Sequence, residues 1–175
     1  MDFRRKTATI AALVLAACLV QAWMISRAVV PAQDSVRYLI VAQGFERDGF
    51  SATLRNQPEQ PLFPALVWLV HRGLTSLGLA TADDWATSLQ VAAAIPLVLS
   101  IVPVYLLFCQ LHGERAAIIA ISLYSLLGGI ARLGADGLSD STHLALFMLA
   151  LWCVARYFSV TTGSCSTGLA PAVAA

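Results

Sequence analysis

Residues 86–109 read ATSLQVAAAIPLVLSIVPVYLLFC, a stretch without a charged side chain. An α-helix needs roughly 20 mainly apolar residues to cross the hydrocarbon layer of a bilayer, and this stretch is long enough. Pro96 and Pro103 interrupt it, which membrane helices tolerate where neighbouring helices or water satisfy the freed carbonyl groups. The stretch therefore predicts a membrane-spanning helix.

The composition of the whole chain points the same way. Hydrophobic residues make up 58% of the chain, charged residues make up 12%, and the mean hydropathy is +0.74, whereas about 25% of the residues of a soluble domain are charged. The formal net charge is +1 and the one basic run lies at residues 4–6, which disfavours a nucleic-acid partner. The four cysteines have neither metal-ligand nor redox spacing. We therefore expect an integral membrane protein whose main surroundings are lipid.

Three further apolar stretches complete the predicted membrane domain. They lie near residues 7–25, 116–131 and 141–158, so the fold class we expect is all-α, with about four transmembrane helices in residues 1–158. A signal sequence cleaved before Cys18 is an alternative for the first stretch, although the residues after Cys18 stay apolar. Residues 159–175 are small and polar, and we expect a flexible tail there.

The region between the first two spans, residues 31–84, is more polar and holds most of the acidic side chains. Val36, Leu39 and Ile40 are spaced three and four apart, which predicts a short amphipathic helix. Pro61 predicts the start of a second helix through Leu77, which could lie in the membrane interface or cross the bilayer. We interpret His71 and Arg72 as the polar face of this helix in the interfacial arrangement. Positive residues tend to remain cytoplasmic; this mildly favours an interfacial helix, with residues 31–84 outside and the amino terminus in the cytoplasm.

In that arrangement two carboxylates lie on the same side of the membrane. Asp34 follows the first span and Asp140 precedes the last. One carboxylate could act as a general base on an acceptor hydroxyl, and the other could orient the substrate or hold a divalent cation. Arg37 could bind a phosphate through its forked donors. The alternative is structural, since aspartate is also a preferred residue at helix starts and arginine contacts headgroups and loops.

Four stretches of the chain resemble the GT-C superfamily of membrane glycosyltransferases, in particular the bacterial branch with aminoarabinose transferases and protein mannosyltransferase-like enzymes. They read DSVRYLIVAQGFERDGF (34–50), NQPEQPLFPALVWLVHRGLTSLGL (56–79), AIPLVLSIVPVYLLFCQLHGERAAIIAISLYSLL (94–127) and GLSDSTHLALFMLALWCVARYF (137–158). In this family an acidic residue ends the first span, a tyrosine follows it on a juxtamembrane helix, and a proline segment opens a second juxtamembrane helix. Asp34, Tyr38 and the segment Glu59–Leu62 match these positions, and Asp140 matches an acidic residue of the fourth span.

The resemblance implies transfer of a sugar from a polyprenyl-phosphate donor to a periplasmic or cell-envelope acceptor, in the inner (cytoplasmic) membrane. Asp34 would be catalytic as the base or the acceptor-orienting carboxylate, with Asp140 as its partner, and Tyr38 and Glu59 would contact substrate. Arg37 is a further candidate for substrate contact, on the chemistry of its donors alone. Gln60 stands where some members carry a lysine. Family members continue with further spans, so the chain would correspond to an amino-terminal part, with a second chain as a further source of the missing spans. The rival interpretation is a small non-enzymatic polytopic membrane protein or subunit.

Overall fold

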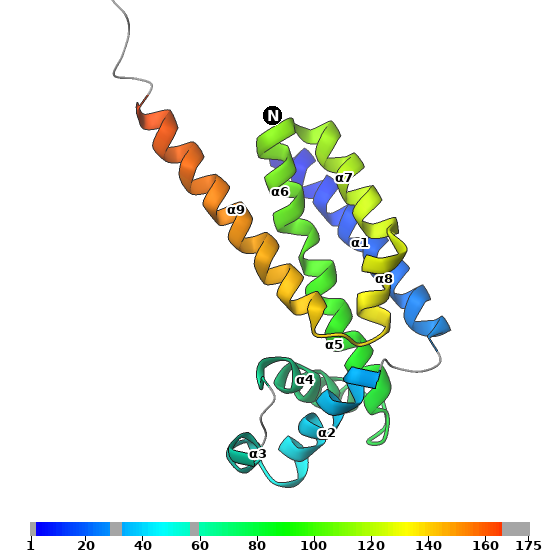
Figure 1. The fold of residues 1–175 in the computed structure, drawn as a ribbon. Helices are drawn as coiled ribbons and strands as arrows, with labels where there is room; N and C mark the ends of the chain where they lie inside the picture. The colour runs from blue at the N-terminus through cyan, green and yellow to red at the C-terminus, as the bar shows by residue number, and fades with distance from the viewer. Residues whose placement is uncertain (1–2, 29–32, 57–59, 166–175) are drawn as a thin grey trace, which may run out of the picture.

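The computed structural model describes residues 3–28, 33–56 and 60–165, and these residues form only α-helices and their connections (Figure 1). The helices, in chain order, are α1 (Phe3–Arg27), α2 (Gln33–Arg47), α3 (Phe50–Asn56), α4 (Leu62–Ser76), α5 (Trp85–Leu99), α6 (Ile101–His112), α7 (Glu114–Leu126), α8 (Gly128–Ala135) and α9 (Asp140–Cys165). The predicted all-α class is confirmed.

Three helical segments are long and apolar enough to cross a membrane: Lys6–Arg27, Trp85–His112 and Asp140–Ser159. The helices α7 and α8 form a fourth span if they are counted as one, although they are bent by 59° against each other. The protein is therefore a polytopic membrane protein with three or four spans. The second of these segments joins α5 to α6 through Ser100, whose backbone keeps helical dihedral angles.

The bend between α7 and α8 was not expected from the sequence, which predicted one span over residues 116–131. Leu127 has an extended backbone, with a φ of −64° and a ψ of 112°. Gly128 and Gly129 follow it, and glycine is destabilising inside a helix because it loses the most conformational freedom on folding. A glycine pair is a common place for a helix to break.

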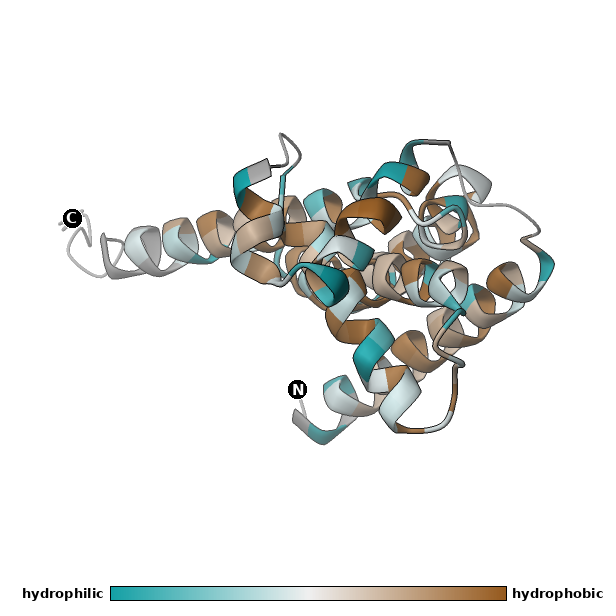
Figure 2. Ribbon diagram, turned by 90° about the horizontal axis from the view of Figure 1, so that it is seen from below, coloured by the Kyte–Doolittle hydropathy of each residue, from teal (hydrophilic) through white to brown (hydrophobic). Residues whose placement is uncertain are grey.

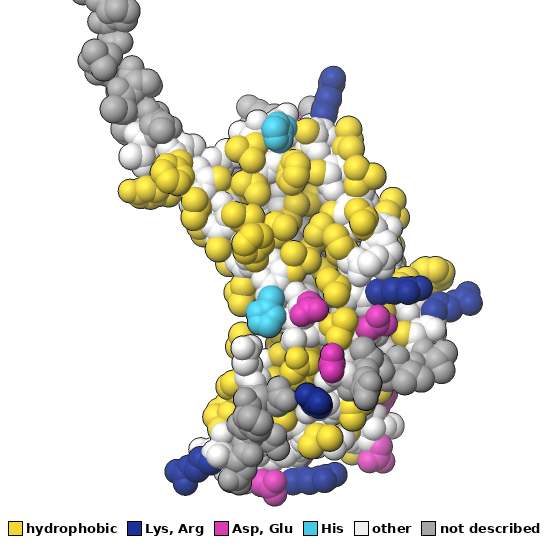
Figure 3. All heavy atoms as spheres, viewed as in Figure 1, with side chains coloured by type: hydrophobic (Ala, Val, Ile, Leu, Met, Phe, Trp, Pro, Cys, Tyr) yellow, Lys and Arg dark blue, Asp and Glu magenta, His cyan; other side chains and the backbone are white. Residues whose placement is uncertain are grey.

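The segment α5–α6 lies at the centre of the bundle. The most apolar window of Trp85–His112 is 61% buried, whereas the corresponding windows of α1 and α9 are 11% and 6% buried. Figures 1 and 2 show α9 running outward, away from the other helices, towards the carboxyl terminus. Apolar side chains cover most of the face of the bundle that Figure 3 shows, as expected for helices that face lipid.

The helices α2, α3 and α4 form a lobe, here called the α2–α4 lobe, across one end of the bundle (Figure 1). Ala42 of α2 and Phe63 and Val67 of α4 pack with Leu89 and neighbouring alanines of α5 in one buried apolar cluster. The sequence predicted two helices here; α2 extends further than expected, to Arg47, and α3 is an additional short helix.

Both ends of the described chain lie on the side of the bundle opposite to the α2–α4 lobe (Figure 1). The start of α1, the turn between α6 and α7 and the end of α9 share that side, while the start of α2 and the turn between α8 and α9 lie next to the lobe. Acidic side chains gather at the level where lobe and bundle meet (Figure 3). This is where the sequence placed its candidate site.

Candidate functional site

A cavity of about 480 Å³ opens where the α2–α4 lobe meets the start of α9. Its lining includes Tyr38, Gln60, Phe63, Ser139, Asp140 and His143. These residues come from three parts of the chain that are far apart in sequence: α2, the start of α4 and the start of α9. We call this space the Tyr38 cavity.

Hydrogen bonds join α2 to the turn between α8 and α9 and so build one wall of the cavity. The Ser35 hydroxyl donates to the carbonyl oxygens of Asp136 and Gly137, at 2.8 and 3.0 Å. The Tyr38 hydroxyl lies 3.0 Å from the hydroxyl of Ser139. Ser35 is fully buried, so these bonds form away from water, where an unpaired carbonyl would be costly.

The ring of Tyr38 is fixed from a second direction by α4. It meets the ring of Phe63 edge to face, with 5.2 Å between the ring centroids. Aromatic pairs prefer this geometry because the positive edge of one ring faces the negative face of the other. Phe63 itself is 4% exposed. The tyrosine hydroxyl is thus held at a defined place on the cavity wall.

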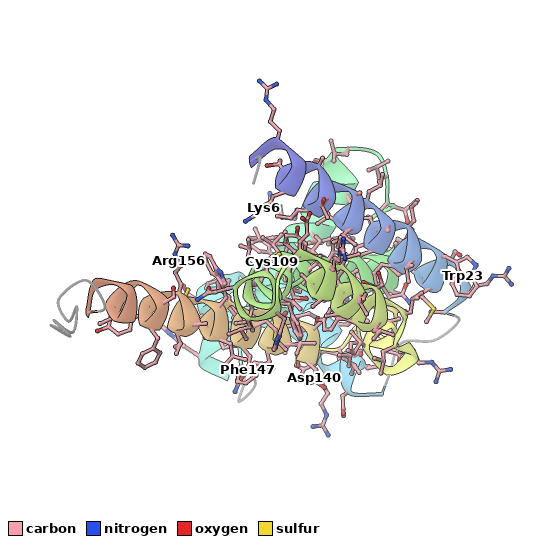
Figure 4. The ribbon with its side chains drawn as sticks, turned by 90° about the horizontal axis from the view of Figure 1, so that it is seen from above. Lys6, Trp23, Cys109, Asp140, Phe147 and Arg156 are labelled. Atoms are coloured by element: carbon pink, nitrogen blue, oxygen red, sulfur yellow. The ribbon has the colours of Figure 1, made fainter. Side chains whose placement is uncertain are left out.

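Asp140 is the first residue of α9 and is exposed on the cavity wall. Figure 4 shows it at the end of α9 opposite to Arg156. His143 lies one turn further along α9 and also lines the cavity. The cavity therefore combines an accessible carboxylate, an imidazole and the hydroxyl groups of Tyr38, Ser139 and Thr142, which together can accept a proton and bind a polar substrate.

The other predicted site residues are placed less centrally or lie outside the described chain. Asp34 is exposed in the first turn of α2, and it is not among the residues that line the Tyr38 cavity. Arg37 is exposed on the same helix, and Glu59 lies outside the described residues. The pairing of Asp34 with Asp140 stays a prediction.

The helix α5 has a side-chain cap at its start. The carboxylate of Asp84 accepts the backbone N–H of Thr87 at 3.4 Å at the start of α5. Within the described ranges of the chain, no group of three or more histidine, cysteine, aspartate or glutamate side chains is placed to hold a metal ion.

His71 occupies a position that sequence reasoning missed. It was interpreted, with Arg72, as part of the polar face of an interfacial helix, but it is 5% exposed. Its Nδ1 lies 3.0 Å from the Ser88 hydroxyl, and its ring stacks on Trp85 with 3.7 Å between centroids and 17° between planes. That interpretation is wrong for His71, because α5 covers this face of α4. Arg72 is exposed, as expected.

Two buried glutamines inside the bundle also escaped prediction. The side-chain amide of Gln21 in α1 donates to the carbonyl of Ala131 at 3.2 Å, and that of Gln90 in α5 donates to the carbonyl of Ala135 at 2.8 Å. Both acceptors lie on α8. The glutamines tie the short broken helix to the rest of the bundle, which orients the turn that carries Ser139 and Asp140.

Fold and site together define the class: a polytopic all-α membrane protein with a helical lobe across one end of its bundle and a polar cavity where the two meet. Comparison with known proteins adds no family to this description, because no family model, no curated protein and no solved structure matches the chain.

Proposed function

We propose that the protein is a membrane glycosyltransferase, or the amino-terminal part of one, that takes its sugar from a polyprenyl-phosphate donor. One observation carries the proposal: the hydrogen bond between Tyr38 and Ser139 brings the first predicted outer segment against the start of α9, beside Asp140. These are the two segments that the resemblance to GT-C enzymes assigns to the active site.

In the proposed reaction the Asp140 carboxylate accepts the proton of an acceptor hydroxyl. The hydroxyl oxygen then attacks the anomeric carbon, and the bond from that carbon to the phosphate oxygen breaks. Polyprenyl phosphate leaves with the bonding electron pair, and the configuration at the anomeric carbon inverts. General-base catalysis of this kind contributes about 10²–10⁴-fold in rate. Tyr38, which lines the same cavity, is the proposed sugar contact.

The remaining predicted residues complete this proposal. Asp34 is the proposed second carboxylate, which would orient the acceptor or hold a divalent cation against the leaving phosphate. Arg37 and Glu59 are the proposed further contacts of the donor. Arginine suits this role because its planar guanidinium offers paired donors to a phosphate.

We propose the inner (cytoplasmic) membrane as the location, with the amino terminus in the cytoplasm. Arg4, Arg5 and Lys6 precede the first span, and Arg115 follows the turn between α6 and α7. The fold supports a common side for these residues, since the start of α1 and that turn lie at the same end of the bundle (Figure 1). The positive-inside rule then puts the Tyr38 cavity on the periplasmic side.

A non-enzymatic membrane subunit is the second candidate. The observation that favours it is α9, whose most apolar window is only 6% buried and which runs outward from the bundle (Figure 2). Such a helix suits packing against further spans, supplied by the same protein or by a second chain. In the subunit interpretation α9 would serve assembly alone.

The test is a transfer assay on the protein purified from its native membranes, so that any partner chain is retained, and reconstituted in liposomes. A panel of radiolabelled polyprenyl-phosphate sugars is offered with a cell-envelope extract, and released polyprenyl phosphate is measured. We expect release by the wild type, a loss of about 100-fold or more in Asp140→Asn, and a comparable loss in Asp34→Asn.

The matched control is Asp83→Asn, which removes an exposed carboxylate between α4 and α5, away from the Tyr38 cavity. This variant should release polyprenyl phosphate at the wild-type rate. If no donor is consumed by the folded protein, or if Asp140→Asn is as active as Asp83→Asn, the glycosyltransferase proposal fails and the subunit interpretation gains.

A further inference from the structure

A second groove lies at the other end of α4 from the Tyr38 cavity. Its volume is about 400 Å³, and its lining includes Arg47 at the end of α2 and His71, Arg72 and Thr75 on α4. The Tyr38 cavity instead uses Leu62 and Phe63 at the start of α4. We call this second space the His71 groove, and the transfer reaction proposed above makes no use of it.

The tautomer of His71 follows from its hydrogen bonds. The Ser88 hydroxyl donates its single proton to the carbonyl oxygen of Asp84, at 2.9 Å, so it can only accept from the imidazole. Nδ1 of His71, 3.0 Å away, therefore carries a hydrogen. The stack on Trp85 holds the plane of the ring. The fixed ring of His71 lines the groove.

Arg72 is also held in place. Its guanidinium carbon lies 5.2 Å from the ring centroid of Trp68, an attractive cation–π distance. The indole N–H of Trp68 in turn donates to the carboxylate of Glu46 at 2.7 Å. Glu46, the one acidic residue in the groove lining, is therefore already bonded to Trp68.

The balance of charge in the groove favours an anion. Arg47 and Arg72 supply two cations against the single carboxylate of Glu46. Both arginines are exposed, and no ion pair engages Arg47 within the part of the chain that the structure describes. Donors thus approach one space from two helices, α2 and α4, with the Thr75 hydroxyl beside them.

We propose that the His71 groove binds a phosphate group, held by the guanidinium groups of Arg47 and Arg72 beside the fixed ring of His71. Guanidinium donors match phosphate oxygens in paired hydrogen bonds, and the Thr75 hydroxyl, which also lines the groove, can donate one more. Two sources supply this chemistry at the end of a membrane bundle: the headgroup of an anionic lipid, and free phosphate. The proposal does not depend on the transferase function.

The experiment uses the full chain labelled with ¹⁵N-histidine, in nanodiscs of zwitterionic phosphatidylcholine. Inorganic phosphate is titrated in, and the Nε2 resonance of His71 is followed, assigned through its loss in His71→Asn. A second arm replaces part of the lipid by phosphatidylglycerol without added phosphate. A saturable shift of Nε2, with Nδ1 keeping its proton, is expected in at least one arm, and the arm that responds identifies the source.

Variants decide whether the groove is responsible. The double change Arg47→Gln and Arg72→Gln should weaken the response ~10-fold or more, which corresponds to about 1.4 kcal/mol. Arg72→Lys should keep most of it because the cation is retained. Arg115→Gln, on the opposite side of the bundle, is the matched control and should bind like the wild type.

Three results would overturn the proposal. The first is a Nε2 resonance that does not move in either arm. The second is an unchanged affinity in the double variant, which would show that the arginines do not hold the anion. The third is an equal loss in Arg115→Gln, which would show a general charge effect and no site.

Discussion

Gly137 should be the glycine that tolerates a methyl group least, because two independent penalties meet there. It lies in the turn between α8 and α9 with a φ of +69°, a region that L side chains rarely adopt. A Cβ at this position would lie 2.6 Å from Cδ2 of Leu89 and 2.7 Å from its Cγ. Leu89 is fully buried, so it cannot simply move into solvent.

The magnitude follows from adding the two penalties for Gly137→Ala. The left-handed conformation costs a residue with a Cβ about 1–2 kcal/mol, and overpacking a closed core costs ~1–3 kcal/mol. We therefore expect the free energy of unfolding to fall by roughly 2–5 kcal/mol. Gly78 is a matched control: its φ is also +69°, but nothing lies within 4 Å of its Cβ position. Gly78→Ala should lower the free energy of unfolding by the conformational penalty alone, about 1–2 kcal/mol.

The assay is equilibrium unfolding in mixed micelles with increasing sodium dodecyl sulfate, followed by tryptophan fluorescence. A double-mutant cycle with Leu89→Ala isolates the clash, because the smaller side chain leaves room for the new methyl group. The coupling energy should recover about 1–3 kcal/mol. The reasoning is refuted if Gly137→Ala and Gly78→Ala lower the free energy of unfolding equally within ~0.5 kcal/mol. It is also refuted if the double variant of Gly137→Ala and Leu89→Ala loses the full sum of the two single losses.

Two further predictions concern the lobe and the bundle. In a cysteine-free background, Ser51→Cys and Asp83→Cys should be labelled by an impermeant reagent from one side of the membrane, and Glu114→Cys from the other side. If Ser51→Cys and Asp83→Cys are labelled from opposite sides, α4 crosses the bilayer and the interfacial arrangement is wrong. Gln90→Leu should cost about 1–2 kcal/mol because it strips a buried carbonyl of its donor, measured by the same unfolding assay. Gln21→Leu should cost less, since the Oε1 atom that it removes is buried without a partner in the described structure; an equal cost would contradict this argument.

The membrane character of the fold was predictable because it depends on composition over long windows. Residues 86–109 lack charge over a length that only a spanning or deeply buried helix explains, and the structure has one continuous segment at Trp85–His112. The bend after α7 was harder to foresee, since single glycines occur in many membrane helices. The chain turns here because Leu127 adopts an extended backbone directly before the pair Gly128-Gly129.

The candidate site was predictable only in part, because sequence order does not give the depth or direction of a side chain. Tyr38 and Asp140 were both selected, and they line one cavity. His71 was misjudged because its partners Ser88 and Trp85 belong to another helix. The signal that could have found it is spacing: Phe63 and Val67 precede His71 at intervals of four, so the histidine continues the buried face of α4.

The segment from Ala131 to Ser139 shows why local sequence carried so little information about the site. Gln21 and Gln90 hold this segment through the carbonyls of Ala131 and Ala135, and Ser35 holds it through two more backbone carbonyls. These four acceptors are main-chain atoms, which any residue type supplies, whereas the bond from Tyr38 reaches a side chain, the hydroxyl of Ser139. The segment's own side chains are therefore constrained mainly in size, as at Gly134, where a Cβ would collide with the amide of Gln21. The donors that place Ser139 and Asp140 lie on α1, α2 and α5, so the position of the cavity is a property of the assembled bundle.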